Sequence, residues 1–144
     1  MKTTNYEISK KLKEIGFEAD TDFYWYCYDK GQEMRHIADA DGRGNVKAYD
    51  LETLLVALPD SIIREYKSNE DGTIKEFEEK LLINKREIWY KCYDIETSDD
   101  ANEFWREYEY QQDISIYRWN DSLTNVAGKM LIKLFEAGLI KFNK

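Results

Sequence analysis

The fold of this chain is decided by residues 121–137, which read DSLTNVAGKMLIKLFEA. Apolar side chains recur there at the i, i+3, i+4, i+7 spacing of one helix face: Leu123, Val126, Ala127, Met130, Leu131, Leu134 and Phe135. One of residues 120–122 caps the start of this helix, and Gly138 supplies a left-handed stop. So wide an apolar face needs a large surface to cover, and the aromatic strands elsewhere in the chain are the candidates.

Two segments have the composition of aromatic strands. Residues 22–29 read DFYWYCYD, with large side chains on both faces, which is typical of a central strand. Residues 88–93, IWYKCY, form a second aromatic strand. Each strand holds one of the two cysteines, Cys27 and Cys92, and this usage is typical of buried thiols in a reducing cytoplasm rather than of a disulfide framework.

Helix signals surround these strands. Thr4 and Glu7 form a Thr-x-x-Glu capping box, which predicts a first helix. Asp50 predicts the N-cap of a second helix, which Pro59 closes. A third helical stretch is expected over residues 98–112.

Residues 73–82 allow two interpretations. Thr73 and Glu76 repeat the capping-box spacing, and the apolar residues that follow have helical spacing, which favours a helix. A turn at 71–72, Asp-Gly, would instead make the same residues a hairpin strand. Further strands are predicted over residues 34–38, 62–67 and 114–119.

These elements do not alternate strictly between helix and strand, so they predict an α+β fold. The expected architecture is a single domain, residues 1–144. Its small, mostly antiparallel sheet would have aromatic strands covered by helices, including the long amphipathic C-terminal one.

The composition is that of a globular protein, with 42% hydrophobic and 35% charged residues among 144. A single proline, Pro59, and the lack of a Gly/Ser linker give no sign of a domain boundary. No apolar run reaches the roughly 18 residues of a membrane span, and the N-terminus does not resemble a secretory signal. We therefore expect a cytoplasmic protein without a membrane partner.

The formal charge is −8, which argues against direct binding of a nucleic-acid backbone. The charge is concentrated in residues 94–113, where only Arg106 opposes eight acidic residues: Asp94, Glu96, Asp99, Asp100, Glu103, Glu107, Glu109 and Asp113. If residues 98–112 form a helix, carboxylates repeat along its surface with Trp105 near the edge. A basic protein surface would complement that pattern, whereas the simpler interpretation is a solvated helix face.

Other motifs are weak. His36 is the only histidine, and no metal-ligand spacing accompanies it, so no metal site is predicted. Residues 39–44, DADGRG, match a calcium loop in part, with Asp50 at its twelfth position. However, Arg43 occupies a ligand position, so we interpret the segment as a turn. No phosphate loop or nucleophile motif is present, and we expect no cofactor and no catalytic residue.

Three segments carry a resemblance. They are the first helix running into Phe23-Tyr24-Trp25-Tyr26, residues 48–59 (AYDLETLLVALP), and residues 121–134. Their order and character resemble small uncharacterised proteins of phages, prophages and mobile elements in Bacteroides-like bacteria. The resemblance covers about half of the chain, leaves residues 60–113 outside, and implies no biochemical activity.

Two functional hypotheses follow. The first is a non-enzymatic phage or mobile-element protein that binds a host protein through an acidic surface, with anti-defence activity as its specific form. Its partner would be a basic nucleic-acid-binding protein, contacted by Asp99, Asp100, Glu103, Trp105, Glu107 and Glu109. The second is a small-molecule or nucleotide-binding protein, a sponge or sensor, that uses Tyr24, Tyr26, Arg35, His36 and Arg43.

Overall fold

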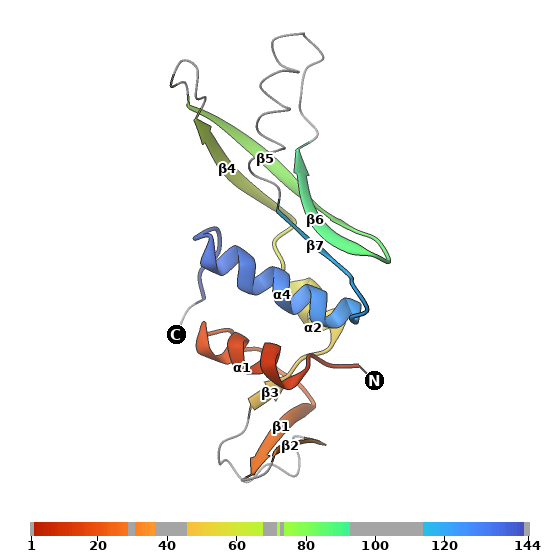
Figure 1. Ribbon diagram of the computed structural model, residues 1–144. Coiled ribbons are helices and arrows are strands. Elements are labelled where there is room, and N and C mark those ends of the chain that lie inside the picture. Colours follow the sequence, from red (N-terminus) through yellow and green to blue (C-terminus); the bar gives the residue numbers. More distant parts are fainter. Residues whose placement is uncertain are drawn as a thin grey trace. The chain divides into compact units, whose positions relative to one another are not determined.

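The computed structural model describes residues 2–28, 31–36, 46–67, 72, 74–92 and 114–142. The chain divides into two compact units, residues 1–58 with 118–144, and residues 59–117. Each unit contains one antiparallel sheet (Figure 1). The predicted α+β class is confirmed, although the strands form two sheets rather than one. That both units fold as one domain stays a prediction.

The first unit combines helices with a three-stranded sheet. Its elements are α1 (Tyr6–Glu14), β1 (Phe23–Tyr28), β2 (Gly31–His36), β3 (Val46–Ala48), α2 (Leu51–Ala57) and α4 (Leu123–Glu136). The strand order is β2-β1-β3, so the aromatic strand β1 is central, as predicted. The C-terminal helix α4 packs against α1 and α2, and α1 also packs against β3.

The apolar stripe of α4 is largely buried. Val126, Ala127, Met130, Leu131 and Leu134 are fully excluded from solvent. Ile8 and Leu12 of α1 and Ile15 at its C-cap are buried as well. These side chains form the core of the first unit because each helix places them on one side at helical spacing.

The second unit is a four-stranded meander. Its strands are β4 (Ser61–Lys67), β5 (Ile74–Ile83), β6 (Glu87–Cys92) and β7 (Ile114–Tyr117), in the order β4-β5-β6-β7. The preference for a helix over residues 73–82 is wrong, because β5 pairs with β4 on one side and β6 on the other. The predicted helix over 98–112 lies outside the described residues.

Helix ends follow the predicted chemistry with one exception. The Asp50 side chain accepts the Thr53 N–H at 2.8 Å, and Ser122 caps α4. The capping box at Thr4 and Glu7 is wrong, since Asn5 is the N-cap of α1. The backbone N–H of Thr4 donates to the Tyr49 carbonyl at 2.9 Å, which holds Thr4 in a strand-like pairing before the helix begins.

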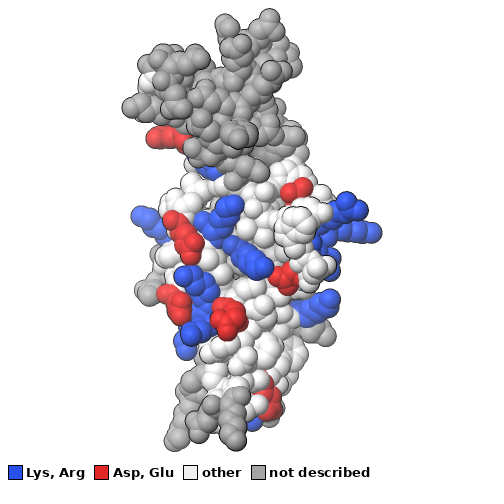
Figure 2. Space-filling view, viewed as in Figure 1, with Lys and Arg blue, Asp and Glu red and all other residues white. Residues whose placement is uncertain are grey.

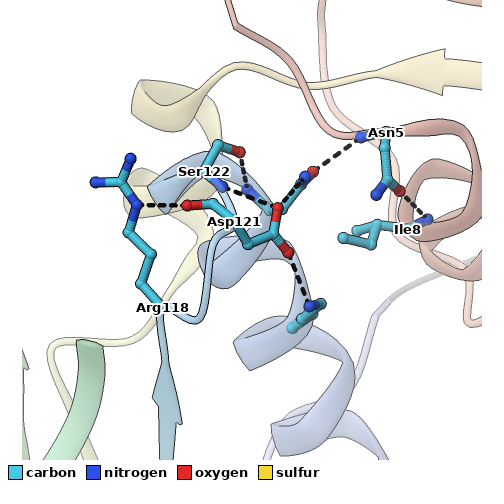
Figure 3. Close-up of polar contacts among 7 residues, drawn as sticks. Asn5, Ile8, Arg118, Asp121 and Ser122 are labelled. Atoms are coloured by element: carbon cyan, nitrogen blue, oxygen red, sulfur yellow. Dashed lines mark hydrogen bonds and ion pairs between the residues drawn. The ribbon is translucent and has the colours of Figure 1, made fainter. Parts of the chain in front are cut away.

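A polar network joins the start of α4 to the N-terminal segment (Figure 3). The Asn5 N–H donates to Asn125 Oδ1 at 2.9 Å, and Asn125 Nδ2 donates to Asp121 Oδ1 at 2.6 Å. Lys129 Nζ lies 2.8 Å from Asp121 Oδ2. Burial acts to raise the pKa of Asp121. The hydrogen bonds that Asp121 accepts from Lys129 and Asn125 outweigh burial, so the pKa is lowered overall.

Candidate functional site

One face of β1 and β2 brings together part of the predicted ligand site. The register places Tyr24 opposite Arg35 and Tyr26 opposite Glu33, so these four side chains share a face. The Arg35 guanidinium carbon lies 3.9 Å from the centre of the Tyr26 ring, a cation–π contact. Arg35 Nε also lies 3.2 Å from Glu33 Oε1.

The positive charge of Arg35 on this face is balanced by the carboxylate of Glu33. Desolvation acts to lower the pKa of Arg35, but the Glu33 carboxylate outweighs it and the pKa is raised, which keeps the guanidinium charged. Tyr24 is completely buried, and its hydroxyl has no hydrogen-bond partner of normal length among the described residues. The Tyr24 hydroxyl is shielded from solvent, and it lies close enough to Arg35 to contribute to the raised pKa of Arg35.

His36 does not join this face. It lies opposite Phe23, and the two rings meet edge to face with centroids 5.6 Å apart. Successive residues of a strand point to opposite faces, so Arg35 and His36 diverge. The two residues that the ligand hypothesis groups therefore lie on opposite faces of β2. Arg43, the fifth residue of that set, lies outside the described residues, as does the calcium-like segment 39–44.

Asp50, the twelfth position of the calcium-like segment, has another role. Its carboxylate caps α2, and its hydrogen bonds to the Thr53 side chain and N–H lower its pKa. Among the described residues, no group of three or more His, Cys, Asp or Glu side chains is placed to hold a metal ion. No helix in the described part of the chain is long and apolar enough to cross a membrane.

The acidic segment connects two neighbouring strands. Tyr90 of β6 pairs with Ile114 of β7, and residues 93–113 run between these strands. Antiparallel neighbours need a connection of only about 2–5 residues, so this insertion is far longer than the sheet requires. The predicted contact residues all lie in it, outside the described residues: Asp99, Asp100, Glu103, Trp105, Glu107 and Glu109.

The second unit presents an exposed face on β4 and β5. Glu65 lies directly opposite Glu76, two carboxylates that repel each other across the strands. Ile63 and Ile74, on the same face, are 64% and 61% exposed. Exposed apolar side chains therefore lie among charged ones on this face, which also carries Glu78 and Lys80.

Surface charge elsewhere is balanced. Basic and acidic side chains are interleaved over the described residues on the face shown in Figure 2. The described residues contain nearly equal numbers of the two kinds, so the net charge of −8 arises from the remaining segments, above all residues 94–113.

The sequence patterns missed Glu33, which holds the guanidinium of Arg35. The i, i+2 spacing of Glu33 and Arg35 in a strand was the signal that could have identified the pair. They also missed the ion pair of Arg64 and Glu79, whose Nε and Oε1 atoms lie 2.8 Å apart and which is almost fully buried.

No family model, curated protein or solved structure matches the chain.

Proposed function

We propose that this protein is a non-enzymatic accessory protein of a phage or mobile element, active in the cytoplasm. It binds a host protein through the acidic insertion, residues 93–113. The specific form is an anti-defence inhibitor that presents carboxylates to a basic nucleic-acid-binding protein, at positions where phosphates would otherwise bind.

The observation that carries the proposal is the place of the charge. Eight acidic residues against one arginine are inserted between two paired strands that need only a short turn. The described remainder is nearly neutral. A local concentration of like charge opposes compact folding, and a basic partner surface would relieve that repulsion on binding.

A second observation supports the same unit as the binding region. The exposed face of β4 and β5 adds Glu65 and Glu76 to the acidic character and adds apolar contact area through Ile63 and Ile74. Charge complementarity would steer the partner and set specificity, while apolar side chains would contribute affinity.

The test is a pull-down from host lysate at low and high salt, followed by titration of any retained protein in purified form. The charge variant carries Glu103→Gln, Glu107→Gln and Glu109→Gln. The matched control removes three exposed charges from the first unit, through Glu14→Gln, Asp20→Asn and Glu52→Gln.

We expect a partner that binds the wild type and the control but not the charge variant. Binding should weaken with salt, because the screening length falls from about 10 Å at 0.1 M to about 3 Å at 1 M ionic strength. Equal capture by all three proteins, or capture that is insensitive to salt, would refute the acidic-surface mechanism.

A small-molecule or nucleotide site is the second candidate, favoured by the cation–π contact of Arg35 with the Tyr26 ring. A mononucleotide at 100 times its Kd would add about 2.7 kcal/mol to the free energy of unfolding. Thermal unfolding with each of the common mononucleotides measures this. The stabilisation by nucleotide should vanish in Arg35→Met and persist in Lys10→Met. If no mononucleotide stabilises the wild type, a site for these ligands is excluded.

A further inference from the structure

The strand β2 lies at the edge of its sheet. It pairs with β1 along its whole length, and no other described strand lies on its far side. Alternate residues of an edge strand direct their N–H and C=O groups away from the sheet, which provides a template for another strand. The side chains of Gln32, Glu33 and His36 are exposed along this edge.

The sequence of β2 is complementary to itself. When two copies of β2 pair antiparallel with Met34 opposite Met34, Glu33 of each copy lies opposite Arg35 of the other. Moving the centre by one residue would place either Glu33 or Arg35 opposite its own copy, and like charges directly opposite destabilise a strand pair. The charges therefore select one register, centred on Met34.

We propose that two copies of this chain associate through β2 into a twofold-symmetric dimer. The pairing joins the two three-stranded sheets into one sheet of order β3-β1-β2-β2-β1-β3. A twofold contact uses the same surface on both copies, so each favourable Glu33–Arg35 contact occurs twice.

Arg35 is positioned for this contact before any partner arrives. Its guanidinium lies over the Tyr26 ring and against its own Glu33, and these contacts limit its conformational freedom. A side chain that is already ordered loses less entropy on binding. Because Arg35 and Glu33 remain 36% and 52% exposed, their charges mainly select the register, while backbone hydrogen bonds supply affinity.

The other edge of this sheet favours a dimer over longer assemblies. That edge is β3, a strand of three residues in which Val46 and Ala48 are 6% and 0% exposed. A short edge strand whose side chains are buried is a poor template for pairing. Of the two edges of this three-stranded sheet, β2 is therefore the one suited to accept a second copy, and a twofold contact closes on itself.

The dimer is tested by measuring the molar mass in solution across a range of protein concentrations. The wild type should approach twice the 17.2 kDa of one chain. Glu33→Arg gives a strand with two arginines, and Arg35→Glu gives one with two glutamates, so each variant repels its own copy. Each should weaken self-association by roughly tenfold or more.

An equimolar mixture of the two variants provides the decisive control, because opposite charges again face each other at both contacts. We expect the mixture to recover the dimer mass as a heterodimer. A second control, Lys10→Glu, changes the charge at an exposed position of α1 and should dimerise like the wild type. Circular dichroism checks that each variant is folded.

A wild type that stays at 17.2 kDa at all concentrations would overturn the proposal. So would single variants that dimerise normally, or folded variants whose mixture remains monomeric. The charge variant of the acidic insertion leaves β2 unchanged, so this outcome is independent of the proposed function.

Discussion

The helix α4 and the strand β5 bury opposite kinds of side chain. In α4, the fully buried side chains are apolar ones such as Val126, Met130 and Leu134. In β5, Glu79 is 2% exposed while Ile74 is 61% exposed. The first element is held by apolar area removed from water, whereas the second has a charge in its interior that needs a partner.

That partner is Arg64 of β4. Its Nε lies 2.8 Å from Glu79 Oε1, and the two side chains are 8% and 3% exposed. A buried ion pair contributes little net stability, since removing two charges from water offsets their attraction. Its stronger effect is on register, because a one-residue slip of β4 against β5 would move Arg64 to the opposite face.

The largest expected effect breaks this pair. Arg64→Met removes the guanidinium that compensates the buried Glu79 carboxylate and should lower the free energy of unfolding by about 3–5 kcal/mol. Adding Glu79→Leu removes the remaining charge and should restore most of the loss. Urea unfolding of the whole chain, with hydrogen exchange to locate the change in β4 and β5, measures both. If the double variant is as unstable as the single one, the uncompensated charge is not the cause of the lost stability.

The next prediction tests the close packing of the helices. A Cβ on Gly128 would lie 2.7 Å from Ile8 Cγ2 and 3.2 Å from Thr4 Cγ2. Gly128→Ala should therefore destabilise the protein by about 1–3 kcal/mol, although alanine favours a helix over glycine.

The matched background for Gly128→Ala is Ile8→Leu, which removes the nearest methyl group. The alanine substitution should cost less there than in the wild type, as measured by thermal unfolding of all four proteins. Equal costs in both backgrounds would contradict a steric cause.

The smallest effect concerns the cap of α2. Hydrogen bonds to Thr53 lower the pKa of Asp50 below its ordinary value of 3.8. The ionised cap therefore contributes stability that is fully present above that value and is lost as the pH falls through the lower, folded-state pKa. Asparagine caps a helix equally well without titrating. Asp50→Asn should have the same free energy of unfolding as the wild type at neutral pH. Below about pH 4 it should lose less of that free energy than the wild type, as measured by acid unfolding. The same pH dependence in both proteins would contradict this.

Sequence patterns identified the elements in which polarity and burial agree. The α4 stripe, the Asp50 cap and the central position of β1 were all confirmed. The helix preference for residues 73–82 failed because Ile74 and Leu81 suit a helix period, while the strand buries Glu79 and exposes Ile74. The capping box failed because a backbone bond to Tyr49 moved the start of α1 to Asn5.

The ligand site stays a prediction. Of its proposed residues, Tyr24, Tyr26 and Arg35 share a face of the sheet, and His36 lies on the other side of the strand. Strand alternation was visible in the sequence, whereas the register that sets Arg35 against Tyr24 depends on how β1 and β2 pair.

The sequence by itself determined the α+β class, most helix ends and the concentration of acidic charge in residues 94–113. These are local properties, set by periodicity, capping chemistry and composition. Only the tertiary structure decided the partners of buried charges, such as Glu79 with Arg64, and the close approach of Gly128 to Ile8. Such contacts join residues far apart in the chain, so their energies depend on burial that no local pattern contains.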